Sequence, residues 1–517
     1  MAADRHILSR AKTVALCTLA SRVLGMARDM LTGAVFGASA GLDMFVVAFT
    51  VPNLFRRLFG EGVLSAAFIP VFTDETIDPQ RDETRLLRVV LTSLTLLLSG
   101  VVLAGWLGCA ATLLFVELSE NGRLFCILLA MLLPYLPLIC MTALLGAALQ
   151  TRHHFLAPAL APTLLNICWI AAAGFFGDRF GVQGLAAAVV VAGGLQFALQ
   201  VPFAWRCGLL LRPLWNLRHP GLRRIARLTA AVLLGLGVTQ LNVLADRIIA
   251  QVCIPGDGAN SVLFFGNRLI QFPLGVFGLA LATAVFPSYA RHAAEGNRIG
   301  LSNTVNMALR TNAFIALPCT AVTIALSRPI VRVIFERGEF SAQSSSRTAT
   351  VLFYYGLGLV GFCGIHLLVR AFYALKDMRT PVKVAAAMVG LNLALNLTLV
   401  WPLREAGLAL SSSVTAMLNA GVLYILLKRR LGPLGRRAIA LSTLRGLLAA
   451  AIAGACAWAV HDALGDVSLP IAPILKQIID LAGALLAAGA VYLAMAALMG
   501  MRELRELRNA ARTRHRP

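Results

Sequence analysis

Three charged residues lie inside the first apolar segment of the chain. Arg22, Arg28 and Asp29 fall within residues 14–36, a length that crosses a bilayer at about 1.5 Å per helical residue. A charge at the bilayer centre costs about 2.5–3.5 kcal/mol on insertion scales, so we expect these side chains to face a wet interior. The alternative is that they snorkel to the two membrane surfaces.

Further charges interrupt later apolar segments. Arg56, Arg57 and Glu61 lie in the second segment, and Arg268 lies in the eighth. Arg57 and Glu61 are four residues apart, so an intrahelical ion pair is the alternative reading for those two. Counting Arg22, Arg28, Arg56 and Arg268 against the carboxylates of Asp29, Asp43 and Glu61 leaves the predicted interior net positive.

This excess of arginine indicates the kind of ligand that the interior would bind. A guanidinium group is always charged and binds phosphate through a two-pronged fork of N–H donors. We therefore expect an anionic, phosphate-bearing substrate. The alternative is that each arginine only ties helices together through backbone carbonyls, as intramembrane polar groups often do.

A second group of polar residues lies in the later segments. Its members are Asn242 and Asp246 on the seventh segment, Asn392 and Asn396 on the eleventh, and Ser411, Ser412 and Ser413 on the twelfth. One carboxylate with amide and hydroxyl oxygens is suited to hold a desolvated Na⁺ or to carry a proton. A simple ion pair between Asp246 and Arg247 is an equal alternative.

The composition is that of a membrane protein. The 517 residues are 58% hydrophobic and 14% charged, with mean hydropathy +0.78, whereas soluble domains average about 25% charged residues. The net charge of +22 needs no nucleic-acid ligand, because cytoplasmic loops of membrane proteins concentrate Lys and Arg. The ten cysteines are scattered without a C-x-x-C pair, which favours small buried hydrophobes over disulfides or metal ligands.

Apolar segments separated by charged or Gly/Pro-rich breaks predict an all-α polytopic protein with about fourteen transmembrane helices. The predicted segments are 12–36, 43–72, 86–116, 122–149, 157–177, 183–205, 226–252, 261–290, 304–326, 348–374, 381–401, 406–427, 439–461 and 472–499. Most of the 46 Lys and Arg residues then fall in one alternate set of loops. This bias predicts that both termini are cytoplasmic and that the basic run 501–517 is a cytoplasmic tail.

The chain also repeats itself. Pro158 and Pro381, which open the fifth and eleventh segments, are 223 positions apart, and so are the Gly-Leu-Ala triplets that begin at Gly184 and Gly407. Two landmarks with one offset predict a duplicated unit of six helices, although chance agreement of small residues is the alternative. The predicted domains are two lobes, two additional helices and the basic tail, at 1–220, 221–430, 431–500 and 501–517. An even number of helices per copy makes the repeats parallel, as in some transporters.

Motifs for catalysis and nucleotide binding are missing from the sequence. Residues 356–361 match G-x-G-x-x-G, but no strand is expected around them, so we assign them to helix packing. The sequence contains no P-loop, no H-E-x-x-H and no nucleophile elbow. We therefore expect a protein that is not an enzyme and has no ATP motor of its own.

Several stretches of the sequence resemble the MurJ (MviN) family of lipid II flippases. The similarity is carried by residues 21–29, 51–62 and 161–166, by Arg268 and by residues 287–288, and it extends over nearly the whole chain. The resemblance implies the fold of the multidrug/oligosaccharidyl-lipid/polysaccharide exporter superfamily, with two six-helix lobes around a central cavity. Two extra C-terminal helices would form a groove for the lipid tail.

The resemblance also implies a substrate and its site. The protein would flip lipid II across the bacterial inner membrane for cell-wall synthesis, with membrane lipids and cell-wall synthesis proteins as further partners. The substrate-binding residues would be Arg22, Arg28, Asp29, Arg56 and Arg268, with Asp43 and Glu61 as less direct members.

The resemblance implies no cofactor beyond Na⁺ as a candidate coupling ion. The sodium site of some members would fall on Asp246, Asn392, Asn396 and Ser412. Asn396 stands where a carboxylate would be a ligand elsewhere, which argues against cation binding here.

Two other functions fit parts of the sequence. A cation-coupled exporter of drugs or polysaccharide lipids, from the same superfamily, would have a net acidic cavity. A non-transporting scaffold for cell-wall synthesis would not need arginines inside the membrane and would tolerate their neutralisation. The cluster of arginines therefore favours the flippase.

Overall fold

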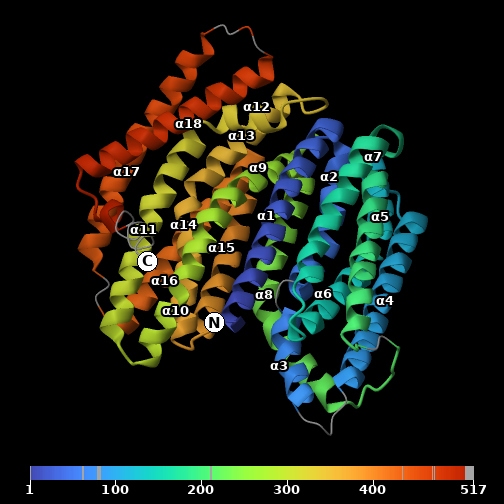
Figure 1. Cartoon of the computed structure of the whole chain (residues 1–517). Coiled ribbons are helices and arrows are strands. Elements are labelled where there is room, and N and C mark those ends of the chain that lie inside the picture. Colours follow the sequence, from blue (N-terminus) through green and yellow to red (C-terminus); the bar gives the residue numbers. More distant parts are fainter. Residues whose placement is uncertain are drawn as a thin grey trace. The chain divides into compact units, whose positions relative to one another are not determined.

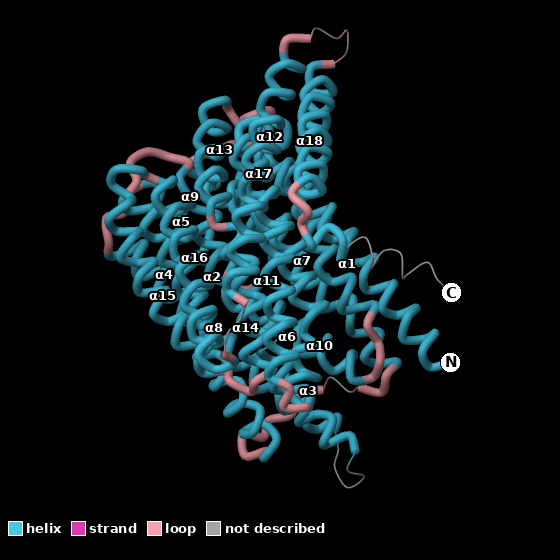
Figure 2. The backbone as a smooth tube through the Cα atoms, turned by 90° about the vertical axis from the view of Figure 1, so that its left-hand side faces the viewer, coloured by secondary structure: helices cyan, strands magenta, loops and turns pink. Residues whose placement is uncertain are grey.

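A computed structural model describes residues 2–60, 63–77, 83–209, 212–432, 435–467, 470 and 472–506. Helices make up nearly all of this part of the chain, and it contains no strand (Figure 2). The predicted all-α class is confirmed. Glu61 and the tail beyond residue 506 lie outside the described residues.

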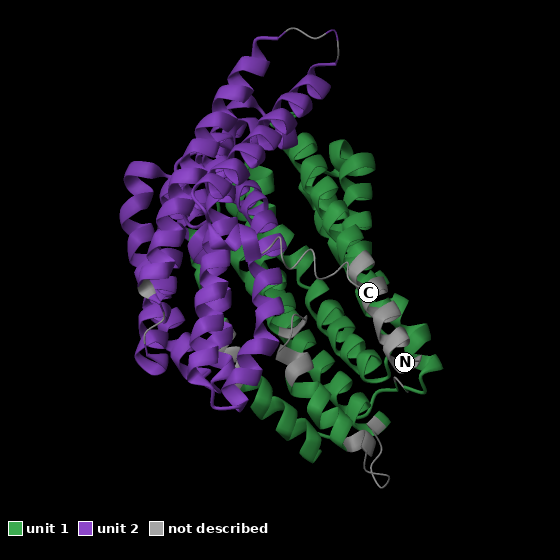
Figure 3. Cartoon of the chain, turned by 60° about the vertical axis from the view of Figure 1, so that its left-hand side comes forward, with its two compact units in different colours: residues 1–248, 337–340 green, residues 249–336, 341–517 purple. Residues whose placement is uncertain are grey.

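The chain divides into two compact units, drawn in different colours in Figure 3. Unit 1 comprises residues 1–248 and 337–340, and unit 2 comprises residues 249–336 and 341–517. The division falls inside one helix, whereas the lobes predicted from the sequence meet at residue 220. The predicted domain limits stay a prediction.

Unit 1 consists of helices with one π-helical segment. Its helices from α1 to α8 are labelled in Figure 1. In chain order they are α1 (Ala2–Phe36), α2 (Ala40–Phe55), the π-helix η1 (Arg56–Gly60), α3 (Val63–Ile77), α4 (Glu83–Phe115), α5 (Glu120–Leu132), α6 (Tyr135–Thr151), α7 (Leu156–Arg206) and most of α8 (Pro220–Cys253). A short piece of chain, residues 337–340, joins this unit at the end of α1, where Glu339 N–H donates to the Ala34 carbonyl (2.8 Å). Gly338 has positive φ there, and a Cβ would collide with that carbonyl.

Unit 2 contains the remaining helices. They are the end of α8, α9 (Ala259–Pro273), the π-helix η2 (Leu274–Leu279), α10 (Ala280–Ala294), α11 (Arg298–Ala325), α12 (Ser327–Phe335), α13 (Ala342–Leu357), α14 (Leu359–Ala374), α15 (Arg379–Leu403), α16 (Glu405–Leu431), α17 (Arg436–Gly465) and α18 (Pro473–Leu498). The sequence reading missed α12. This helix is too short to span a bilayer, and it buries Val331 and Phe335 while Arg328 and Arg332 stay exposed.

The helices agree with the predicted segments. Among the described residues, nine helices are long and apolar enough to cross a membrane, or ten if the bent pair α13–α14 is one span. Helix α7 counts once there, although a kink at Gly181 divides it between the segments predicted at 157–177 and 183–205. Helices α1, α2–α3 and α8 cover three further predicted segments. The structure is therefore consistent with about fourteen spans.

The 223-residue offset recurs in the backbone. Helices α6 and α14 end at Thr151 and Ala374, and the next helices begin at Leu156 and Arg379, each pair 223 residues apart. Both helices also end in the same way, since a non-glycine residue with φ near 60° follows at 153 and at 376.

The hydrogen bonds at these two helix ends match as well. His153 and His154 N–H donate to the carbonyls of residues 150 and 149, and Lys376 and Asp377 N–H donate to those of residues 373 and 372, which is the Schellman arrangement. The kink at Gly181 (φ 54°) has its counterpart 223 residues later at Arg404 (φ 52°). The repeated backbone conformations support the duplication that the sequence landmarks predicted.

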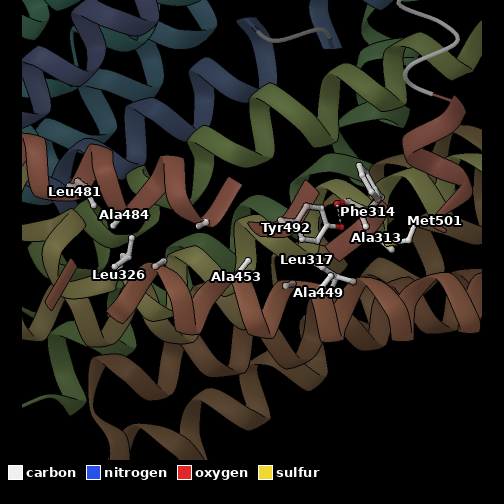
Figure 4. Packing of buried hydrophobic residues seen from close by; sticks show 14 residues of the cluster. Ala313, Phe314, Leu317, Leu326, Ala449, Ala453, Leu481, Ala484, Tyr492 and Met501 are labelled. Atoms are coloured by element: carbon white, nitrogen blue, oxygen red, sulfur yellow. Dashed lines mark hydrogen bonds between the residues drawn. The ribbon is translucent and has the colours of Figure 1, made fainter. Parts of the chain in front are cut away.

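The last two helices pack together with α11 (Figure 4). Alanines line much of this contact, among them Ala449, Ala453 and Ala484, so the helix backbones approach closely. The Tyr492 hydroxyl donates to the Phe314 carbonyl (2.7 Å), the hydrogen bond dashed in Figure 4. The two helices outside the repeat are thus built into the core of unit 2.

Candidate functional site

The charged stretch of α1 forms a buried cluster within unit 1. Arg28 is 7% exposed and Asp29 is 3% exposed. The Arg28 guanidinium donates through Nε and Nη2 to Asp29 Oδ1, at 2.9 and 2.6 Å. Helix α1 therefore places both of these side chains inside unit 1.

Two residues of α7 complete this cluster. Arg28 Nη1 donates to Asn166 Oδ1 (3.1 Å), and the guanidinium carbon lies 4.8 Å from the centroid of the Trp169 ring. The indole N–H donates to the Thr32 hydroxyl (2.9 Å). We call these five residues, Arg28, Asp29, Thr32, Asn166 and Trp169, the Arg28 cluster.

The cluster leaves part of the hydrogen-bonding capacity of the guanidinium unused. An arginine has five N–H donors, and the hydrogen bonds described for Arg28 use one on each of its three nitrogens. Two donors, one on each terminal nitrogen, remain for an anion. A buried cation with spare donors is suited to bind phosphate oxygens, since charge-assisted hydrogen bonds strengthen away from water.

The sequence reading missed the role of α7. Asn166 was included only among the residues that resemble a known family, and Trp169 was not predicted as a site residue. A tryptophan inside an apolar segment carries no sequence signal of pairing with a cation 141 residues earlier. Only the packing of α1 against α7 brings the two together.

The other predicted substrate residues of unit 1 are spread over α1, α2 and η1. Arg22 is exposed on α1, and Asp43 is 3% exposed in the first turn of α2. Arg56 begins the π-helix η1 and donates through Nε to Asn53 Oδ1 (2.9 Å). π-Helical turns often occur at functional sites, so the position of Arg56 is compatible with its predicted role. Glu61 and its pairing with Arg57 lie outside the described residues.

Arg268 belongs to unit 2. It is half-buried on α9, and its guanidinium carbon lies 5.1 Å from the centroid of the Phe264 ring. One turn further along the helix, the Gln271 amide donates to Asn267. Like Arg28, this cation rests on an aromatic face, a contact worth about 0.5–2 kcal/mol.

The polar residues of α15 and α16 form an uncharged network. Asn396 Nδ2 donates to Asn392 Oδ1 (3.1 Å), and Asn392 Nδ2 donates to the Ser411 hydroxyl (3.0 Å). Ser411 in turn donates to the Asn392 carbonyl (3.0 Å), and Thr415 donates to the Ser411 carbonyl (2.7 Å). These four residues, the Asn392 network, are all buried. The predicted Ser412 is half-buried beside them.

Two of the oxygens that a sodium ion would need in the Asn392 network already accept hydrogen bonds. Na⁺ needs several oxygen ligands, but Asn392 Oδ1 and the Ser411 hydroxyl are already engaged within the network. The network contains no carboxylate. Asp246 is on α8 in unit 1, where it is half-buried and accepts from Asn242 (3.5 Å). We derive no transport step from a bound cation, and the sodium site stays a prediction.

Comparison with known proteins decides the family. The sequence model described as "Lipid II flippase MurJ" matches residues 33–469. The chain belongs to the MurJ family. A relative from Vibrio cholerae, described as "Probable lipid II flippase MurJ", is 32% identical over 523 residues, covering 98% of each chain. The "Lipid II flippase MurJ" of Burkholderia cenocepacia is 34% identical over 430 residues, covering 81% of this chain and 83% of the relative.

Solved structures agree on the fold. A structure described as "Lipid II flippase MurJ, inward closed conformation" matches with a TM-score of 0.79 at 22% identity, covering 94% of this chain and 98% of that one. An inward-facing multidrug resistance MATE family transporter of the MOP superfamily matches with a TM-score of 0.68 at 14% identity, covering 80% and 96%. At these identities the likenesses establish the architecture alone. The MurJ assignment and the apolar helices together make this a multi-pass membrane protein.

Proposed function

We propose that this protein flips lipid II, the lipid-linked peptidoglycan precursor, from the inner to the outer leaflet of the bacterial cytoplasmic membrane. The observation that carries the proposal is the Arg28 cluster, a buried cation with spare N–H donors in a chain of the MurJ family. An arginine with spare N–H donors fits the pyrophosphate of lipid II better than it fits a cationic drug. A non-transporting scaffold would have no use for such a cluster.

The proposed mechanism replaces water around the headgroup. The sugars, peptide and pyrophosphate of lipid II cannot enter hydrocarbon without losing their hydration. The guanidinium groups of Arg22, Arg28, Arg56 and Arg268 would supply hydrogen bonds to the pyrophosphate. Asp29 would hold Arg28 in place between cycles. Alternating access would then expose the headgroup on the outer side.

The remaining parts of the chain take supporting roles in this proposal. Helices α17 and α18 would form the groove for the undecaprenyl tail, which stays in lipid. Both termini would be cytoplasmic, and the membrane potential, at about 2.3 kcal/mol per charge per 100 mV, would bias the cycle. The protein would perform no bond chemistry on lipid II and would work beside the cell-wall synthesis proteins.

The test follows lipid II on the outer leaflet of cells in which this protein is the sole flippase. We expect exposure to require the protein and to fall to the depleted level in Arg268→Ala. Arg332→Ala is the matched control, because Arg332 is exposed on the short helix α12 outside the proposed site. Lipid II exposure that continues without any functional copy would favour the scaffold and contradict the flippase.

A further inference from the structure

Trp169 packs directly against the Arg28 guanidinium. It is 2% exposed and is among the largest fully buried side chains of the protein. One face of its ring receives the Arg28 guanidinium at 4.8 Å. The edges of Phe45 and Phe49 pack near it at centroid distances of 5.2 and 5.5 Å, with the planes nearly perpendicular. These contacts hold the indole in one orientation.

Two consecutive hydrogen bonds tie the indole to the helix that carries Arg28. The Trp169 N–H donates to the Thr32 hydroxyl (2.9 Å), and Thr32 donates to the Arg28 backbone carbonyl (2.8 Å). The ring therefore contacts the guanidinium while its N–H is fixed to the backbone of the same residue. These contacts therefore fix the position and the orientation of the guanidinium relative to the indole ring.

Asn166 fixes the guanidinium from a second direction. Its side-chain oxygen accepts from Arg28 Nη1, and its Nδ2 donates to the Ser21 carbonyl (3.0 Å). The amide thus spans two turns of α1. Gly25 lies between them, and a Cβ there would meet the Asn166 amide at 3.8–4.0 Å. The absence of a side chain at Gly25 leaves room for the Asn166 amide beside α1.

We propose that Asn166 and Trp169 are positioning residues of the lipid II site, acting through Arg28. They hold the guanidinium so that its two remaining N–H donors point in a fixed direction before the ligand arrives. A free arginine side chain has about 2 kcal/mol of rotamer entropy to lose, so this order increases affinity for the pyrophosphate. The inference rests on the proposed function, and it adds two residues that would never touch the substrate.

The experiment is a double-mutant cycle on the purified full chain, with lipid II as the probe. The dissociation constant is measured for the wild type, Trp169→Leu, Arg28→Ala and the double variant. We expect Trp169→Leu alone to weaken binding about tenfold relative to the wild type. In protein that already carries Arg28→Ala, the same change should weaken binding less than twofold, because the indole acts through the guanidinium. The undecaprenyl tail keeps binding measurable in the arginine variant.

Conservative variants separate positioning from packing. Trp169→Phe keeps an aromatic face but removes the N–H donor to Thr32, so we expect it to restore most of the affinity lost in Trp169→Leu. Asn166→Leu is combined with Arg28→Ala in a second double-mutant cycle, and it removes only the hydrogen bonds to Arg28 and Ser21. The matched control is Trp401→Leu, the same change at an exposed position of α15, with unchanged affinity expected.

The outcomes distinguish the two proposals. If Asn166→Leu and Trp169→Leu weaken lipid II binding by the same factor with Arg28→Ala as without it, the two residues contribute only general packing. That result would overturn this inference alone. Wild-type protein that does not bind lipid II, or that binds it equally well with and without Arg28, would overturn the proposed function and this inference with it. Coupling in both cycles with rescue by Trp169→Phe would support positioning.

Discussion

The two units contain buried polar clusters of opposite character. In unit 1, the Arg28 cluster joins a cation and a carboxylate to an amide, a hydroxyl and an indole. In unit 2, the Asn392 network contains amides and hydroxyls alone, and all of its described hydrogen bonds are between neutral groups. Both clusters connect two helices, α1 with α7 and α15 with α16.

The comparison separates a site for a ligand from a site for stability. Neutral hydrogen bonds join helices at little desolvation cost and leave nothing for an anion to bind. A buried ion pair has a high desolvation penalty and stabilises a fold poorly relative to apolar packing. A chain that retains Arg28 with spare donors inside an apolar unit therefore has a use for that charge beyond holding helices together.

The largest effect that we expect comes from removing the charge of the Arg28 cluster. Arg28→Ala should reduce outer-leaflet lipid II to the level of depleted cells, because the pyrophosphate loses its buried partner. The single change also removes Arg28 from its ion pair with the buried Asp29 carboxylate, which costs about 3–5 kcal/mol of stability. The measurements are lipid II exposure in cells and thermal unfolding of the purified protein.

The double variant Arg28→Ala/Asp29→Ala distinguishes these two losses. Removing both charges should recover most of the stability without recovering transport. Transport by the double variant at the wild-type level would mean that the ion pair only joins α1 to its surroundings, as the Asn392 network joins its helices.

A second ion pair tests whether charge alone makes a functional site. Arg310 Nε donates to Glu503 Oε1 (2.6 Å), which also accepts from Ser442 (2.8 Å), in unit 2 beyond the end of α18. Glu503→Gln should lower stability by about 1.5–3 kcal/mol and leave transport by the folded protein unchanged. Loss of transport at full stability would extend the functional charges to this helix end.

The same pair predicts a dependence on pH. Burial raises the pKa of the Glu503 carboxyl, but a backbone N–H hydrogen bond, the hydrogen bonds with Arg310 and Ser442 and the charge of Arg310 outweigh burial, so the pKa is lowered from 4.5. A lowered carboxyl pKa adds stability that is fully present above about pH 5 and is lost as the pH falls through the folded-state value. Wild type should therefore lose its stability advantage over Glu503→Gln in acid.

A smaller effect is expected in the Asn392 network. Asn396→Leu removes the donor to Asn392 Oδ1 and should lower the free energy of unfolding by about 1 kcal/mol, with transport retained. The matched control is Asn216→Leu, the same change in the loop between α7 and α8, outside any helix. Loss of transport in folded Asn396→Leu would show that the neutral network is also a functional site.

The smallest effect concerns sodium. Replacing external Na⁺ with choline should leave lipid II exposure unchanged within about twofold, since Asn392 Oδ1 and the Ser411 hydroxyl already accept hydrogen bonds within the Asn392 network. The measurement is made at constant membrane potential, with Asn396→Asp beside the wild type. A wild-type requirement for Na⁺ would mean that the network rearranges into a cation site.

Local sequence patterns were sufficient for much of the fold. The apolar segments, the charged residues inside them and the break near Gly181 follow from composition along single helices, and the 223-residue offset follows from matching landmarks. Helix α12 was missed because its amphipathic pattern is shorter than a span. The kinks within the segments, such as the bend at Gly358 between α13 and α14, depend on packing and were not predicted.

The sequence by itself determined that Arg28 and Asp29 must lie away from lipid, because the cost of placing a charge in hydrocarbon depends on the residue and its segment alone. It also determined the resemblance to the MurJ family. Only the tertiary structure decided which residues meet that charge. Asn166 is 138 residues from Arg28 in the chain, and Trp169 is 137 residues from Thr32. Contacts over such distances depend on how whole helices pack, and no local pattern of residues encodes them.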